Sequence, residues 1–114
     1  MKAAIVFVAL LSTSVAFAHG DHPPKLAQCT AKECTQAQIE KAIPLAIQAL
    51  IKEDEIAPSW AKMKMEKLVK KQFKKNSEWV ATFVDPSPKT PAEQRLYVFI
   101  TLDGYLNGSN YTGE

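Results

Sequence analysis

The chain has 114 residues, with 14 basic and 12 acidic side chains, so its formal net charge is only +2. This near-neutral balance argues against a general nucleic-acid-binding protein, which would carry a strongly basic surface. A chain of this length supports one small hydrophobic core, and we expect a single domain.

Residues 1–18 have the three zones of a secretory signal peptide. Lys2 gives the positive start, residues 3–11 are an unbroken apolar run, and small residues follow up to Ala18. The run is too short for a membrane-spanning helix, which needs about 20 apolar residues. We therefore predict a periplasmic or secreted protein, cleaved after Ala18 or, alternatively, after Ala16, with no membrane span in the mature chain.

Residues 19–34 contain few apolar side chains and are expected to form a flexible leader that ends in a disulfide loop. The leader holds both histidines of the chain, His19 and His22. If cleavage follows Ala18, the free amine and imidazole of His19 can chelate Cu(II), and His22 or Asp21 can complete a tetragonal site. The alternative is a polar leader that eases signal processing, in which the histidines are incidental. A copper-handling protein is thus one functional hypothesis.

The two cysteines of the chain, Cys29 and Cys34, lie close together in the sequence. In an oxidising compartment such a pair usually forms a structural disulfide. A zinc site is the alternative, but it would need further cysteine ligands nearby. A redox-active pair more often has the spacing C-x-x-C. We predict the disulfide.

A helix is expected to begin at Thr35, where Thr35 as N-cap and Gln38 fit a capping box. An amphipathic stripe follows and stays in phase across Pro44, which predicts one bent helix rather than two. The helix is expected to end in segment 53–58, which contains three acidic residues and a proline. The stripe consists of Ile39, Ala42, Ile43, Ala46, Ile47, Leu50 and Ile51.

The segment 60–75 fits a helix and a strand about equally well. Read as a helix, Met65, Leu68, Val69 and Phe73 form one side. Read as a strand, Met63, Met65, Val69 and Phe73 share one face, with Lys67 and Lys71 as misfits.

The second half of the chain predicts antiparallel strands. Residues 78–84 are aromatic and β-branched, which suits a half-buried strand. The proline-rich segment 85–91 predicts a loop, and residues 95–102 alternate strongly, with Leu96, Val98, Ile100 and Leu102 on one face and Tyr97 and Phe99 on the other. Asp103-Gly104 is a hairpin signal before a last strand in 105–112. A helix followed by such strands predicts an α+β fold.

Several short motifs together resemble a family of small exported bacterial proteins of unknown function, whose pattern is similar to one PepSY-like unit. The resemblance implies a strand over 62–74 and one domain over 35–113, in which an amphipathic helix packs on a meander of three or four antiparallel strands. PepSY-like domains are associated with regulating exported peptidases and with binding in the cell envelope. The chain departs from the family at Pro44, in the Cys29/Cys34 pair and in its lysine-rich first strand. The motifs are Ser59-Trp60, Glu78-Trp79-Val80, Leu96-Tyr97-Val98-Phe99, Leu102-Asp103-Gly104 and Asn110-Tyr111-Thr112-Gly113.

The resemblance implies a small non-enzymatic module that docks a peptide or protein through its sheet or a free strand edge. A basic, envelope-surface-associated protein is a further alternative, because lysines crowd the first strand and could contact an anionic partner or membrane surface. The opposing interpretation is a solvated strand on which lysines discourage aggregation. The candidate residues for an anionic partner are Lys64, Lys67, Lys70, Lys71 and Lys74.

We expect no enzyme, because no histidine follows His22 and both cysteines are assigned to a disulfide, which leaves no nucleophile–base pair. Met63 and Met65 could act as soft Cu(I) ligands, although methionines at alternate strand positions more often belong to a core. The aromatic residues Trp60, Trp79, Tyr97 and Phe99 are expected to pack in the core or on the sheet.

Overall fold

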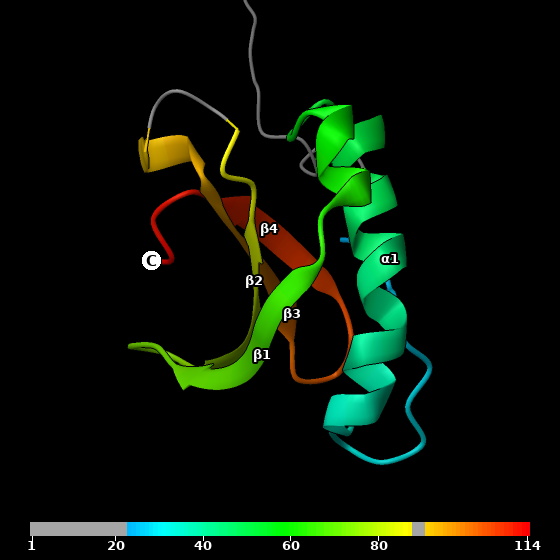
Figure 1. Ribbon diagram of the computed structural model, residues 1–114. Helices are drawn as coiled ribbons and strands as arrows, with labels where there is room; N and C mark the ends of the chain where they lie inside the picture. Colours follow the sequence, from blue (N-terminus) through cyan, green and yellow to red (C-terminus); the bar gives the residue numbers. More distant parts are fainter. Residues whose placement is uncertain (1–22, 88–90) are drawn as a thin grey trace, which may run out of the picture.

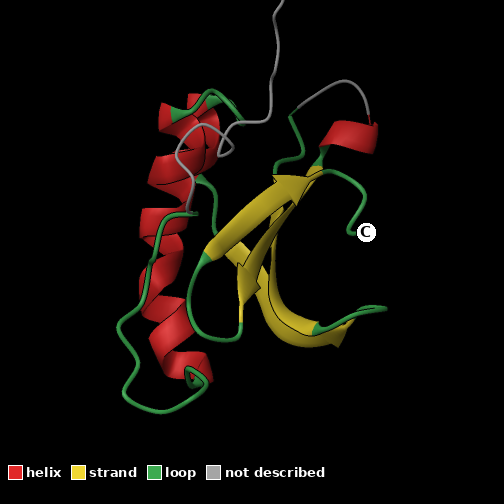
Figure 2. Ribbon diagram, turned by 180° about the vertical axis from the view of Figure 1, so that it is seen from behind, coloured by secondary structure: helices red, strands yellow, loops and turns green. Residues whose placement is uncertain are grey.

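The computed structural model describes residues 23–87 and 91–114, so the predicted signal peptide lies outside the described part. One helix covers one face of an antiparallel sheet with the strand order β1-β2-β3-β4. Figures 1 and 2 show the helix on one side of the strongly curved sheet and the chain's C-terminus on the other. This is the predicted α+β fold. The elements are α1 (Gln36–Lys52), the 3₁₀ turn η3 (Pro58–Lys62), β1 (Met65–Gln72), β2 (Ser77–Val84), the 3₁₀ turn η4 (Pro91–Glu93), β3 (Arg95–Thr101) and β4 (Leu106–Asn110).

The helix α1 begins with the predicted capping box. The Thr35 Oγ1 accepts a hydrogen bond from the Gln38 backbone N–H, and the Gln38 side chain accepts one from the Thr35 N–H. These two bonds satisfy backbone donors that the first turn leaves unpaired. The helix continues through Pro44 without interruption, so the prediction of a single helix is confirmed.

The hydrophobic core lies between α1 and the sheet. All predicted stripe residues of α1 up to Leu50 are buried. On the sheet, β3 directs Leu96, Val98 and Ile100 toward the helix, as the alternation predicts. The face of the sheet opposite α1 is called the open face below. The remaining helix-facing strand residues are Leu68, Trp79, Ala81, Phe83 and Leu106.

Strand β1 confirms the strand predicted within 62–74, but its side chains do not alternate as expected. A bulge interrupts the pairing of β1 with β2 between Met65 and Lys67. A bulge inserts one residue and so reverses the face of every later side chain. Met65 therefore pairs with helix-facing Phe83, whereas Val69 pairs with Val80 on the open face. The expectation that Met65 and Val69 share a face is wrong, and Leu68 takes the core position instead.

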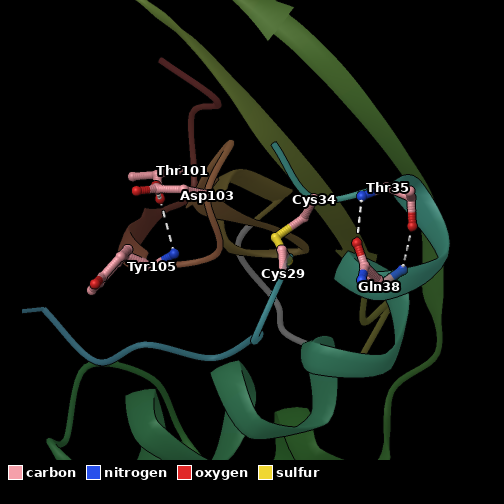
Figure 3. Close-up of a disulfide and its surroundings, with 7 residues drawn as sticks. All are labelled: Cys29, Cys34, Thr35, Gln38, Thr101, Asp103 and Tyr105. Carbon is pink, nitrogen blue, oxygen red and sulfur yellow. Dashed lines mark hydrogen bonds between the residues drawn. A yellow bond between two sulfur atoms is a disulfide. The ribbon is translucent and has the colours of Figure 1, made fainter. Parts of the chain in front are cut away.

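The predicted disulfide joins Cys29 and Cys34 and closes a short loop in the segment before α1. Figure 3 shows the two sulfur atoms near the β3–β4 turn, where the Tyr105 N–H donates to Thr101 Oγ1. The Cys34 N–H donates to the Leu102 carbonyl at 2.8 Å, which holds the disulfide loop on the hairpin. The middle of the predicted leader also lies along this hairpin: the Leu26 N–H donates to the Gly104 O, and the Leu106 N–H donates to the Pro24 O.

The loop after β2 begins with a turn centred on Asp85. The Asp85 Oδ1 accepts hydrogen bonds from the Ser87 hydroxyl at 2.6 Å and from the Ser87 backbone N–H at 3.0 Å. The hydroxyl bond contributes most, and both bonds favour the charged carboxylate, so they lower the pKa of Asp85 below its usual value.

Replacement of Ser87 by alanine is expected to raise the pKa of Asp85 toward its ordinary value. A carboxyl whose pKa is lowered by folding stabilises the native state above the unfolded-state pKa, and that contribution disappears as the pH falls through the folded-state pKa. In Ser87→Ala, the stabilising contribution of the Asp85 carboxylate should therefore be smaller, and it should disappear at a higher pH than in the unchanged protein. The side-chain carboxyl resonance of Asp85, followed by NMR against pH, measures the effect. The exposed Ser59 gives a matched control, Ser59→Ala, and an Asp85 titration unchanged by Ser87→Ala would contradict the assignment.

Candidate functional site

The outer edge of β1 is an unpaired strand edge, and the predicted lysine residues lie in or next to this strand. Strand β1 hydrogen-bonds to β2 on one side only. In Figure 1 it is the front strand of the sheet, and no other described segment runs along its outer side. An unpaired edge presents a row of backbone donors and acceptors that can accept another strand. The other edge differs, because the segment before the disulfide bonds to the start of β4.

The predicted lysine residues gather at this edge, but they are divided between the two faces of the sheet. Lys67 and Lys71 pair with Thr82 and Glu78 of β2 and lie on the open face. Lys70 lies on the helix-facing side. The five predicted lysines thus do not form one flat basic face. They form a basic rim along the edge of the sheet, called the lysine rim below. Lys64 precedes β1, and Lys74 follows it in the turn to β2.

Two of these lysines make contacts within the chain. The Lys70 Nζ lies 3.3 Å from the Glu33 Oε1, and it also lies 5.5 Å from the centre of the Trp79 ring. The Lys71 Nζ donates to the Gly113 carbonyl at 3.3 Å. The Lys70–Glu33 pair is about half exposed on both sides, so solvent screens it and its contribution to stability is small.

The other lysines of the rim keep their charge available. Glu66 is the acidic residue within β1, and its carboxylate pairs with the Arg95 guanidinium of β3. Among the described residues, the ammonium groups of Lys64, Lys67 and Lys74 have no carboxylate within salt-bridge distance. The rim therefore presents unneutralised positive charge beside unpaired backbone groups.

The open face next to the rim is partly apolar. Val69 is 43% exposed although it is a large aliphatic side chain. Further along, Phe73 meets Phe99 edge to face, with ring centres 5.9 Å apart. These two rings line a hollow of about 280 Å³ that also includes Glu78 and Asn107. The exposed Val69 side chain would thus give an added strand an apolar contact beside the charge of the rim.

Glu78 is a buried acid in this hollow, with only 7% of its surface exposed. Its Oε2 accepts a hydrogen bond from the Asn107 Nδ2 at 2.8 Å, and its cross-strand neighbour is Lys71. The Asn107 amide thus gives this buried carboxyl group a hydrogen-bond donor, as a buried polar group requires. The sequence does not indicate the burial of Glu78, because its hydrogen bond with Asn107 joins β2 to β4.

The C-terminal segment also lies on the open face, which the sequence did not indicate. Gly113 has φ of +83°, and a Cβ at this position would meet the Tyr97 ring at 3.2 Å. The Asn110 Oδ1 accepts hydrogen bonds from the backbone N–H groups of Thr112 and Gly113. A glycine in an Asn-x-x-Gly sequence is the signal that could have suggested this turn.

The candidate copper ligands His19 and His22 lie outside the described residues. Within residues 23–87 and 91–114, no three His, Cys, Asp or Glu side chains gather closely enough to hold a metal ion. No helix in the same part of the chain is long and apolar enough to cross a membrane.

The chain was compared with protein-family models, with curated proteins and with solved structures. Neither the curated proteins nor the solved structures gave a match. One family model, described as "Family of unknown function (DUF6488)", matches residues 1–114. Because that match covers the whole chain, the protein belongs to this family of unknown function.

Proposed function

We propose that the protein is an exported, non-enzymatic binding module that takes an extended acidic segment of another protein along the outer edge of β1. The single observation that carries the proposal is the coincidence of an unpaired strand edge with lysines that have no carboxylate partner among the described residues. Backbone hydrogen bonds would supply affinity, and the lysine rim would select for acidic side chains.

Other features support the same proposal. The Cys29–Cys34 disulfide fits an oxidising compartment and therefore an exported protein. The order of one helix and a four-stranded meander fits a PepSY-like unit, a type of domain associated with binding in the cell envelope. Exposed Val69, on the open face beside the rim, offers a place for an apolar side chain of the bound segment.

A charge-reversal experiment tests the electrostatic part of the proposal. The probe is a short fluorescein-labelled peptide of alternating glutamate and valine, and binding is measured by fluorescence anisotropy. Exposed ion pairs contribute up to about 1 kcal/mol each, so Lys67→Glu together with Lys74→Glu should weaken binding by about tenfold. Added salt should weaken binding of the unchanged protein, because the lysines are exposed.

The matched control reverses two exposed lysines of α1, Lys41→Glu and Lys52→Glu. These variants change the net charge equally but leave the β1 rim intact, and binding should persist. A second probe carries N-methyl groups on alternate residues, which removes the donors needed for strand pairing. Equal binding of both probes would contradict strand addition. Equally strong, salt-sensitive binding to anionic vesicles but not to the peptide would instead favour a membrane-surface role.

A further inference from the structure

A second candidate site lies in a groove between α1, η3 and the start of β1. The groove has a volume of about 320 Å³. Two thioether side chains and one indole line it: those of Met63, Met65 and Trp60. Trp60 is buried, whereas both methionines are half-buried and so remain accessible from solvent. The groove includes Met65, the first residue of β1, but it lies on the helix-facing side of the sheet, and a ligand there would bind independently of a peptide along the β1 edge.

The backbone explains why these three side chains meet. The Met63 N–H donates to the Trp60 carbonyl at 3.1 Å, which closes a 3₁₀ turn. Trp60 and Met63 are three residues apart across this turn, and both side chains line the groove. The chain is extended at Met63, with ψ of 148°, and residues two apart in an extended chain share a face. Met65 therefore follows Met63 into the groove, while Lys64 between them is exposed.

The chemistry of the groove suits a soft monovalent cation. Thioether sulfur is a soft donor that prefers Cu(I) to hard divalent ions. Both cysteines are held in the disulfide, so no thiolate of this chain competes for such an ion. A neutral thioether leaves the metal's positive charge in place, and an indole face stabilises a nearby cation. Among the described lining residues, Glu40 is the one that carries a charge, and that charge is negative.

We propose that Met63 and Met65 are thioether ligands of a Cu(I) site against the Trp60 indole. No charged lysine lines the groove, although lysines flank both methionines in the sequence. If the two methionines only filled space in the core, their volume would matter and their sulfur atoms would not. Volume-conserving substitution by leucine therefore separates a metal site from a packing role.

Silver(I) is the probe, because it has the same preference for thioethers and does not change oxidation state during the titration. The purified protein is labelled with ¹³C at the methionine methyl groups and titrated with silver nitrate in chloride-free buffer. The methyl resonances of Met63 and Met65 are expected to shift together, and Trp60 fluorescence should be quenched. Methyl resonances that stay in place while silver binds would overturn the proposal, whatever the variants do.

The variant pair Met63→Leu with Met65→Leu tests the ligands directly. Changes to the outer shell of a metal site already cost about tenfold or more in affinity, so loss of two ligands should cost at least as much. Ile47→Leu, which alters the same groove without touching sulfur, is the matched control and should bind silver normally. A further variant, His19→Ala with His22→Ala, separates this groove from the leader. Silver binding that disappears in the histidine variant but survives in the double-leucine variant would overturn the assignment to the methionines.

Discussion

Leu50→Ala is expected to destabilise the protein by about 3–4 kcal/mol, a large part of the total stability of a small domain. Leu50 lies in the last turns of α1, and none of its surface is exposed. Its truncation would leave a cavity between the helix and the sheet that the surrounding side chains fill only in part. Urea denaturation followed by circular dichroism measures the change as a lower midpoint with an unchanged slope.

Leu45→Ala is the matched control for this prediction. Leu45 lies in the same helix, but half of its surface is exposed. The substitution should change the free energy of unfolding by less than about 0.5 kcal/mol, because alanine favours a helix and little contact is lost. Equal effects of the two variants would contradict the burial of this face of α1 against the sheet.

Gly104→Ala is expected to cost about 3 kcal/mol, through backbone strain and overpacking together. Gly104 has a backbone φ of +97°, and residues other than glycine adopt this angle only at a cost in free energy. A Cβ at this position would also lie 2.9 Å from the Ala27 carbonyl oxygen and 3.2 Å from the Cys34 sulfur. The substitution would therefore push the disulfide loop away from the β3–β4 turn. Thermal and urea unfolding measure the loss.

Gly108→Ala separates the two contributions. Gly108 in β4 also has positive φ, at +151°, but a Cβ there would meet no atom within 4 Å. It should therefore show the backbone cost without the steric one, and its destabilisation should be clearly smaller than that of Gly104→Ala. If the two variants were equally destabilised, the close docking of Ala27 and Cys34 on the turn would be contradicted.

Local patterns in the sequence were sufficient for much of the fold. The capping box at Thr35 and Gln38 acts within one turn, so the start of α1 could be predicted from neighbouring residues alone. The alternation in β3 likewise assigned Leu96 to the core and Tyr97 to the open face. The Asp103-Gly104 signal correctly placed the turn before β4.

The remaining features depend on contacts between distant residues. The bulge in β1 arises where this strand pairs with β2. It moves Val69 to the open face, whereas strict alternation of side chains along the strand predicted the same face as Met65. Burial of Glu78 requires Asn107 from another strand. The lysine rim was visible in the sequence as a group of charges, but its division between two faces followed only from the register of β1.

The most direct test of the proposed function is amide hydrogen exchange along β1, resolved by residue, with and without the acidic peptide. An added strand pairs with alternate residues of the edge, so alternate β1 amides should exchange more slowly in the complex while those already bonded to β2 change little. Protection confined to β1 is the predicted result. Saturating peptide that leaves β1 exchange unchanged, or that protects a different element, would contradict the proposal that the outer edge of β1 is the binding site.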